Sequence, residues 1–392
     1  MSEEVSMGAT FTFNTTPSII SGAGSCTGAG ETLLLTLGQR VLLVTDKGLL
    51  KLGVLQPLLD SMLTVGIQVT IFNEVEADPP EHNVLSAVQL AARISATGVI
   101  GVGGGSPMDV AKVVALLQGS KQPIGEVYGV GVARGPRLPL ALIPTTAGTG
   151  SEVTPIAILT MGEAQKKGII SPYLLPDVAI LDAELTVGLP RATTAATGID
   201  AMVHAIEAFT SASPSNNPIS RGLARQALQL LGANISKATF NGTDRGAREG
   251  MLLGAMLAGQ AFANSPVAAV HALAYPIGAR FHVPHGLSNA LVLPHVMRFN
   301  LAEVPASYGE LSTDVFPELS KLDVARRGQA FIDSLVAMIQ ELGLPSRLRD
   351  AGIPRSSLEL LAKDAMKQTR LLVNNPRELK ESDALAIYEA AF

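Results

Sequence analysis

Four residues of the types that bind metal ions lie in the second half of the chain. Asp200 and His204 are four residues apart in GIDAMVHAIEAFTS, so on a helix their side chains share one face, one turn apart. His271 and His285 follow in VHALAYPIGARFHVPHG. A single Asp–His pair is more often structural, but four such polar side chains in apolar surroundings need partners. Three imidazoles and one carboxylate suit Fe²⁺, Zn²⁺ or another divalent ion, so the sequence predicts one metal site.

A glycine-rich stretch in the first half could bind a phosphate. Gly98–Val102 has the pattern of a strand, and Gly103, Gly104, Gly105 and Ser106 follow it at the start of a helical pattern. Glycines let the backbone approach a phosphate closely, and the helix N-terminus supplies unpaired N–H groups. The residues therefore indicate a pyrophosphate-binding turn, with a tight turn that binds nothing as the alternative.

The start of this helix suggests a structural role for a nearby carboxylate. Ser106 fits the N-cap, Pro107 the first helical position and Asp109 the third, which is a variant of the capping box. We therefore interpret Asp109 as a helix-capping residue and not as a catalytic one.

Four segments, in order, resemble the signature stretches of the iron-containing, or group III, alcohol dehydrogenase family. They are GGGSPMDVAK (103–112), PTTAGTGSEVTP (144–155), GIDAMVHAIEAFTS (198–211) and PHGLSNALVLPH (284–295). The resemblance runs from about Phe11 to the C-terminus. It implies a dehydroquinate synthase-like architecture, an NAD cofactor, pyrophosphate binding at the glycine turn, and an iron or other divalent ion held by the Asp–His₃ set.

The resemblance also implies further cofactor-binding residues. Asp46 follows a predicted strand and matches the cofactor-selecting aspartate of the family, which favours NAD over NADP because its carboxylate can bond ribose hydroxyls. Thr145, Thr146 and Gly150 resemble the residues that line the nicotinamide and phosphate side. Lys166 resembles a lysine near the cofactor. The alternatives are an ordinary strand-end aspartate and a solvated surface lysine.

One position departs from the family pattern. Many relatives carry a histidine four residues after the third ligand, where it is thought to help relay a proton, but this chain has Tyr275. A phenol donates and accepts hydrogen bonds, yet its ordinary pKa is about 10. Tyr275 is thus a candidate either for the proton relay or for orienting the substrate. We interpret the other histidines as non-ligands: His82 as exposed, His282 as outside the ligand pattern, and His295 as a capping or packing residue.

The secondary structure predicted around these residues changes along the chain, from alternating strands and helices to helices alone. Up to about residue 188, short β-rich runs alternate with helical stretches, which predicts a parallel, Rossmann-like sheet with crossover helices. Strands are predicted at 40–45, 68–72, 98–102, 138–143 and 178–181, an edge strand or hairpin at 9–20, and helices at 50–65 and 81–96. Later, helical periodicity dominates, at 190–211, 220–238, 244–263 and 322–342. We therefore predict an NAD-binding α/β domain over 1–188 and an all-α metal-binding and substrate domain over 189–392.

Composition disfavours several classes of protein. Charged residues make up 16% of the chain, against about 25% in typical domains, so we expect a homodimer or larger homo-oligomer to cover part of the surface. The net charge of −5 and the scattered basic residues disfavour a nucleic-acid binder. No apolar stretch approaches the length of a membrane span. The single cysteine, Cys26, excludes an intrachain disulfide, and the acidic first ten residues do not resemble a secretory signal, so we expect a cytoplasmic protein.

Together these features predict a metal- and NAD-dependent oxidoreductase that interconverts a small-molecule alcohol with an aldehyde or ketone by hydride transfer. Related alternatives are a hydroxyacid–oxoacid transhydrogenase and a maleylacetate-reductase-like enzyme. A dehydroquinate-synthase-like lyase is disfavoured, because the mostly apolar stretch around 270–290 lacks the many basic residues that hold a phosphorylated acid. A nucleotide-binding regulatory protein without activity is disfavoured by the intact set of four ligands. The sequence names neither the substrate nor the metal.

Overall fold

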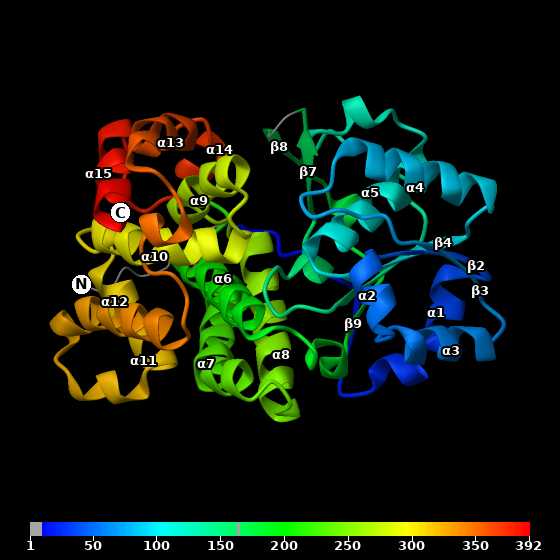
Figure 1. Cartoon of the computed structure of the whole chain (residues 1–392), viewed down its shortest axis with the longest axis horizontal. Coiled ribbons are helices and arrows are strands. Elements are labelled where there is room, and N and C mark those ends of the chain that lie inside the picture. The colour runs from blue at the N-terminus through cyan, green and yellow to red at the C-terminus, as the bar shows by residue number, and fades with distance from the viewer. Residues whose placement is uncertain (1–9, 163–164) are drawn as a thin grey trace. The chain divides into compact units, whose positions relative to one another are not determined.

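The structure is a computed structural model that describes residues 10–162 and 165–392, and these fall into two compact units (Figure 1). Asn14–Gly188 form the first unit, and residues 10–13 with Leu189–Phe392 form the second. Among the described helices, none is both long and apolar enough to cross a bilayer.

A six-stranded parallel sheet forms the centre of the first unit. Its strand order is β1-β9-β6-β4-β2-β3, and every pairing is parallel. The strands are β1 (Ser18–Ser21), β2 (Arg40–Val44), β3 (Gln68–Phe72), β4 (Gly98–Gly103), β6 (Leu140–Pro144) and β9 (Val178–Leu181). The inner strands β4, β6 and β9 are buried throughout, because helices cover both faces. The predicted α/β fold with a parallel sheet is confirmed.

Alternate residues of β2 supply two cores, one on each face of the sheet. Leu42 and Val44 belong to the core that includes α4 (Glu81–Arg93) and α5 (Gly105–Ser120). Val41 and Leu43 belong to the opposite core, which includes α1 (Gly30–Leu37) and α3 (Gln56–Thr64). Figure 1 shows these helix pairs on opposite sides of the sheet. This alternation follows from the two-residue period of a strand.

Two predictions for the first unit are corrected. The single helix predicted at 50–65 is wrong: α2 (Lys47–Leu52) ends at Gly53, and α3 starts three residues later. Gly53 has a φ of 70°, a left-handed conformation that terminates a helix and that glycine adopts at low cost. Of the edge strand or hairpin predicted at 9–20, the structure shows the edge strand, but it begins only at Ser18, as β1, and pairs in parallel with β9. Residue 9 lies outside the described residues.

A second, three-stranded sheet was not predicted from the sequence. It contains β5 (Gly129–Val130), β8 (Gln165–Ile170) and β7 (Ile156–Met161), in that order. β7 and β8 are antiparallel. Ala157 and Leu159 of β7 are fully buried in the core beside α4 and α5, so within the first unit one face of this sheet packs against that core.

The second unit is helical. Its helices are α6 (Arg191–Thr210), α7 (Pro218–Phe240), α8 (Arg245–Asn264), α9 (Ala269–Phe281), α10 (His285–Asn300), α11 (Pro305–Val315), α12 (Val324–Glu341), α13 (Leu358–Ala365), α14 (Thr369–Leu372) and α15 (Glu381–Ala391). No strand occurs over 189–392, which confirms the predicted helical fold. Asn217 and Asp244 cap α7 and α8 by accepting bonds from backbone N–H groups.

Helix α6 lies at the centre of this unit. It packs against α7, α8 and α10, and almost all of its residues from Thr194 to Thr210 are buried. A helix buried all round is normally apolar. Its buried Asp200, His204 and Glu207 are therefore exceptions that require polar partners.

Candidate metal centre and nucleotide site

Three buried polar side chains of α6 share one face of the helix. Asp200, His204 and Glu207 are spaced by four and then three residues, which places them on successive turns of the same side. His271 lies in the first turn of α9, and His285 is the first residue of α10. Three helices therefore position the four residues that the sequence predicts as ligands.

The structure brings these four predicted ligands together. One ligand atom from each of Asp200, His204, His271 and His285 lies within 4.8 Å of all the others. The rings of His204 and His271 stack with centroids 4.8 Å apart. Ligand atoms on one ion, each about 2.1 Å from it, are separated by at most about 4.2 Å. A small inward movement of the side chains is enough to reach coordination distance.

The protonation states of this cluster suit a cation. Burial alone raises the pKa of Asp200, but His285, His204 and His271 and a bond from Asn289 outweigh it and lower the pKa below its ordinary value. Burial, reinforced by His204 and His285, lowers the pKa of His271 well below its ordinary value. The site thus combines an ionised carboxylate with a neutral imidazole, the forms that bind divalent metals.

Asn289 supplies a second sign that the cluster fits an ion. Its Nδ2 donates to Asp200 Oδ1 at 2.5 Å and lies 3.3 Å from Nε2 of both His271 and His285. Its Oδ1 is buried without a hydrogen-bond partner among the described residues. The Asn289 NH₂ group thus contacts three of the four predicted ligands, and this set of one carboxylate and three imidazoles fits a divalent cation.

Glu207 is a functional candidate that the sequence analysis missed. Its Oε2 lies 2.6 Å from His271 Nδ1, and its Oε1 accepts a bond from the backbone N–H of Val270 at 2.7 Å. Burial raises the pKa of Glu207 to about 7, against the lowering effect of the backbone N–H groups and of His204. The available signal was its place in AIEAF, three residues after His204, where an acid interrupts an apolar run.

The predicted nucleotide residues of the first unit gather at one edge of the sheet. Asp46 follows β2, Gly103 ends β4, and Thr145 follows β6. These strands are neighbours in the sheet, so their carboxyl ends share the edge where parallel sheets bind ligands. The backbone N–H of Thr145 donates to Gly103 O at 2.9 Å. The loop at 145–150 (TTAGTG), called the hydroxyl loop below, is therefore bonded directly to the glycine turn at 103–105.

Gly105 allows a close approach of the hydroxyl loop, whereas even a Cβ at Gly104 would make only an ordinary contact with it. A Cβ added at Gly105 would lie 3.2 Å from the Thr149 side chain, and one added at Gly104 would lie 3.6 Å from Thr146 Oγ1. Gly150, at the end of the loop, has a φ of 58°, which favours glycine. Thr145 is buried, whereas Thr146 is half-buried.

The predicted capping role of Ser106 and Asp109 is wrong. Helix α5 begins at Gly105, its N-cap is Gly104, and no side chain caps it. Asp109 instead accepts bonds from Ser151 Oγ at 2.7 Å and from the backbone N–H of Ile158 at 2.9 Å. Because Gly104 is the N-cap, the helix starts before Ser106. The Asp109 carboxylate instead accepts hydrogen bonds from the segment at 151–158.

Lys112 is the centre of a buried network that the sequence analysis did not identify. Its Nζ donates to Ser151 Oγ at 2.7 Å, to Thr154 Oγ1 at 3.1 Å and to Ile156 O at 2.7 Å. It also lies 3.8 Å from Asp109 Oδ1. Burial lowers the pKa of Lys112 to about 8, although nearby carboxylates oppose this change. These bonds connect the segment at 151–156, which follows the hydroxyl loop, to α5.

The comparisons with known proteins identify the family. The model of the iron-containing alcohol dehydrogenases matches residues 16–183, and the model of the C-terminal part of the Fe-containing alcohol dehydrogenase family matches residues 194–392. The chain belongs to the iron-containing alcohol dehydrogenase family. The family predicted from the sequence motifs is thereby confirmed, and the protein is an oxidoreductase of the alcohol and aldehyde type.

Individual relatives resemble this alcohol dehydrogenase over nearly its whole length. Long-chain-alcohol dehydrogenase 1 of Geobacillus thermodenitrificans is 42% identical over 361 residues, 90% of each chain. A crystal structure of 1,3-propanediol oxidoreductase is similar with a TM-score of 0.94 and 34% identity, over 98% of this chain and 100% of that one. A sulfoacetaldehyde reductase from Bifidobacterium kashiwanohense, solved in complex with NAD⁺, has a TM-score of 0.87 and 27% identity, over 98% and 99%.

In this alcohol dehydrogenase, Tyr275 lies beside two of the predicted ligands. Its ring centroid is 6.3 Å from that of His271, edge-on, and 5.8 Å from that of His285. Phe262 stacks on His204 with centroids 4.3 Å apart. Two aromatic rings therefore adjoin the imidazole cluster.

The other histidines of the dehydrogenase do not join this cluster. His82 is exposed, as predicted, and lies 3.5 Å from Glu76. His282 ends α9 in a left-handed conformation, with a φ of 53°. His295 lies within α10, where burial lowers its pKa to about 4, in agreement with a packing residue.

Two predicted cofactor residues of the dehydrogenase have structural partners. Asp46 is the N-cap of α2, and its Oδ1 accepts a bond from the Leu49 N–H at 2.9 Å. Lys166 lies on β8 of the small sheet, and its Nζ forms an ion pair with Asp78 Oδ1 at 2.7 Å. Their roles in cofactor binding stay predictions.

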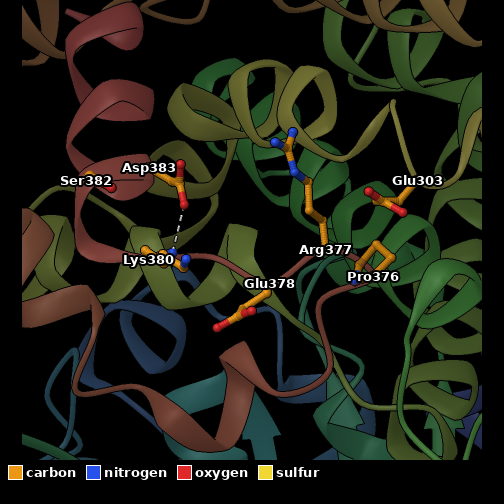
Figure 2. Close-up of a pocket in the computed structure, with 7 residues that line it drawn as sticks. All are labelled: Glu303, Pro376, Arg377, Glu378, Lys380, Ser382 and Asp383. Atoms are coloured by element: carbon orange, nitrogen blue, oxygen red, sulfur yellow. Dashed lines mark hydrogen bonds between the residues drawn. The ribbon is translucent and has the colours of Figure 1, made fainter.

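A surface hollow in the helical unit of the dehydrogenase is separate from these residues (Figure 2). It has a volume of about 640 Å³ and is lined by Glu303, Pro376, Arg377, Glu378, Lys380, Ser382 and Asp383. Asp383 accepts a bond from the backbone N–H of Lys380, and Arg377 donates to Phe299 O and stacks on that ring. Several of its polar groups already serve the local fold, and no predicted site residue lines it.

Proposed function

We propose that this protein catalyses the NAD-dependent interconversion of a small-molecule alcohol with its aldehyde or ketone at one divalent metal ion. Asp200, His204, His271 and His285 would hold the ion. The observation that carries the proposal is the convergence of their ligand atoms within 4.8 Å in a family of iron-containing alcohol dehydrogenases. When bound, the ion supplies positive charge that favours the ionised form of an alcohol and polarises a carbonyl in the reverse direction.

The side chains around the cluster prepare it for this chemistry. Asp200 supplies the negative charge that neutralises part of the cation, and Asn289 fixes one of its oxygens. Phe262 covers one face of His204, so it excludes water from that side. The ring of Tyr275, beside His271 and His285, would orient the alcohol.

We propose that Asn14–Gly188 bind NAD, which supplies the hydride acceptor, and that Leu189–Phe392 hold the metal and the substrate. The uncapped backbone N–H groups at the start of α5 suit a pyrophosphate. Gly103, Gly104, Gly105 and Ser106 form this turn, and Thr145, Thr146 and Gly150 lie on the loop against it. The sulfoacetaldehyde reductase of similar structure was solved with NAD⁺, in support of this cofactor.

Asp46 is the residue we propose for selecting NAD. Its Oδ1 caps α2, and a carboxylate has further lone pairs that can accept bonds from ribose hydroxyls. Lys166 is included in the proposed cofactor site only because it resembles a lysine of the family. In the structure its ammonium group pairs with Asp78.

We also propose that the enzyme is a cytoplasmic homodimer or larger homo-oligomer. The low share of charged residues, 16%, supports this assembly, as do exposed leucines such as Leu35 and Leu63, at 88% and 72% exposure. Cys26 is a free, buried cysteine, which suits a reducing compartment.

A screen for NADH formation with alcohols and hydroxyacids tests the proposed function. The protein is purified without oxygen or chelator, stripped of metal, and reloaded with Fe²⁺ or Zn²⁺ in parallel. We expect reduction of NAD by at least one alcohol, in proportion to metal content. Metal-loaded protein that reduces no cofactor with any alcohol, or stripped protein that retains full activity, would overturn the proposal.

A further inference from the structure

We infer that Glu207 is a positioning residue that fixes the tautomer and orientation of His271, so that this imidazole binds the metal through Nε2. The inference rests on the proposed metal site and deepens it. It concerns a residue outside the ligand set: Glu207 contacts His271 at Nδ1, whereas His271 Nε2 faces Asn289, which also contacts Asp200 and His285.

The first observation is the contact at Nδ1. Glu207 Oε2 lies 2.6 Å from His271 Nδ1, and both side chains are buried. The other oxygen of Glu207 already accepts the Val270 N–H at 2.7 Å. When Glu207 is ionised, its carboxylate can only accept hydrogen bonds. The short contact therefore places the imidazole proton on Nδ1 and leaves the lone pair on Nε2.

The second observation comes from the opposite ring nitrogen. Nε2 of His271 faces Nδ2 of Asn289 at 3.3 Å. An amide NH₂ group is a donor only, so it faces a lone pair more favourably than an N–H. The contacts on the two sides of the ring therefore indicate the same tautomer.

The backbone around His271 is held by the same carboxylate. Helix α9 has Ala268 at its N-cap and no side-chain cap from its own sequence. The bond from Val270 to Glu207 satisfies one of its otherwise unpaired N–H groups. One side chain of α6 thus anchors both the start of α9 and the ring that α9 carries. The arrangement matches the carboxylate–histidine pairs that orient metal-binding imidazoles in other proteins.

Substitution of Glu207 with glutamine tests this role. The amide has nearly the same size, and its oxygen can still accept the Val270 N–H. Its NH₂ group would then face His271 Nδ1 as a donor and force the proton onto Nε2, where it blocks coordination. We expect the affinity for Zn²⁺ or Co²⁺, measured by competition with a chromophoric chelator, to fall about 10- to 100-fold.

Glu152→Gln is the matched control. Glu152 is also a buried glutamate whose pKa burial raises to about 7, but it belongs to the first unit, whereas the four predicted ligands belong to the second. We expect its metal affinity to equal that of the unmodified protein. Equal affinities for Glu207→Gln and Glu152→Gln would overturn the inference.

Nitrogen-15 NMR of histidine-labelled, metal-free protein supplies a readout that a merely structural role would not change. His271 is assigned from the signal lost in His271→Asn. We expect a protonated Nδ1 and an unprotonated Nε2 in the unmodified protein, and the reverse in Glu207→Gln. Protonation on Nε2 in the unmodified protein would overturn the inference, and this measurement stands even where Glu207→Gln does not fold.

The two proposals can fail separately. Unmodified protein that binds no divalent ion would remove the metal site and with it the proposed function. Protein that binds the ion and oxidises alcohols, but has equal affinities in the two glutamine variants, would remove only the role of Glu207.

Discussion

The two candidate sites of this chain are built by different means. In the helical unit, side chains from α6, α9 and α10 converge, and the chemistry depends on the types of four residues. At the sheet edge of the α/β unit, the groups proposed to meet the cofactor are largely backbone N–H groups and small residues that follow β4 and β6. A single substitution can therefore remove a ligand from the metal cluster. The backbone groups of the nucleotide site cannot be removed in this way, so a substitution weakens that site mainly by disturbing the side chains that support the backbone.

The largest effect is expected at the metal cluster. His271→Ala removes one of four ligands, so we expect loss of the bound ion and a fall in kcat of at least about 10³-fold, because the ion contributes several kcal/mol of charge stabilisation. Elemental analysis and alcohol oxidation by the same preparation measure both. Full metal occupancy in this variant would remove His271 from the ligand set.

The second largest effect is expected in the α/β unit, at the buried Lys112 that supports the proposed nucleotide site. Lys112→Met leaves Asp109 and its partners buried without their cation, so we expect the free energy of unfolding to fall by about 3–5 kcal/mol and NAD to bind more weakly. Denaturant unfolding and NADH fluorescence measure the two changes. Lys166→Met is the control for stability, because its partner Asp78 is half-exposed and such a pair contributes about 1 kcal/mol or less. Equal losses in both variants would contradict a special role for Lys112.

A pH dependence follows from Glu152, a buried glutamate that interacts electrostatically with Lys112. Burial raises the pKa of Glu152 from 4.5 to about 7, so between these values the folded state holds a proton that the unfolded state has released. The stability that protonated Glu152 contributes to the folded state is fully present below about pH 4.5 and is lost as the pH rises through 7. We expect Glu152→Gln to flatten the fall in unfolding free energy across this window. Identical slopes for the two proteins would show that Glu152 titrates normally.

The sequence predicts regular elements better than the contacts between them. β3 and β9 have the predicted bounds, and α6 lies within one residue of its predicted range, because buried strands and long periodic helices leave a local pattern. The break at Gly53 depends on one backbone conformation. The pairings of Glu207 with His271 and of Asn289 with Asp200 join residues 64 and 89 positions apart. Such contacts have no local pattern, so the ligands could be predicted from their types while the residues that support them could not.

A smaller effect is expected at the proposed cofactor-selecting residue. Asp46→Asn removes the charge that would repel a 2′-phosphate but keeps an oxygen that can cap α2. We expect the ratio of kcat/KM for NADP to that for NAD to rise about tenfold, or 1.4 kcal/mol. Asp46→Gly also removes the side-chain cap and should show a similar change in ratio with some loss of stability. An unchanged ratio in both variants would leave Asp46 as a helix cap alone.

The smallest effect is expected at Tyr275, which adjoins the metal cluster but lies outside it. The ring packs against His271 and His285, and Tyr275→Phe keeps this ring while removing the hydroxyl. The residues next to it, Leu273, Ala274 and Ile277, are apolar, and the ordinary pKa of a phenol, about 10, is poorly matched to proton transfer near neutral pH. Loss of a general acid–base group typically lowers kcat by about 10²–10⁴-fold. We expect no such loss here: kcat should stay within a few-fold, with a change in KM or in the range of alcohols accepted. A fall in kcat beyond about 100-fold at unchanged metal content would instead place the Tyr275 hydroxyl in the proton relay.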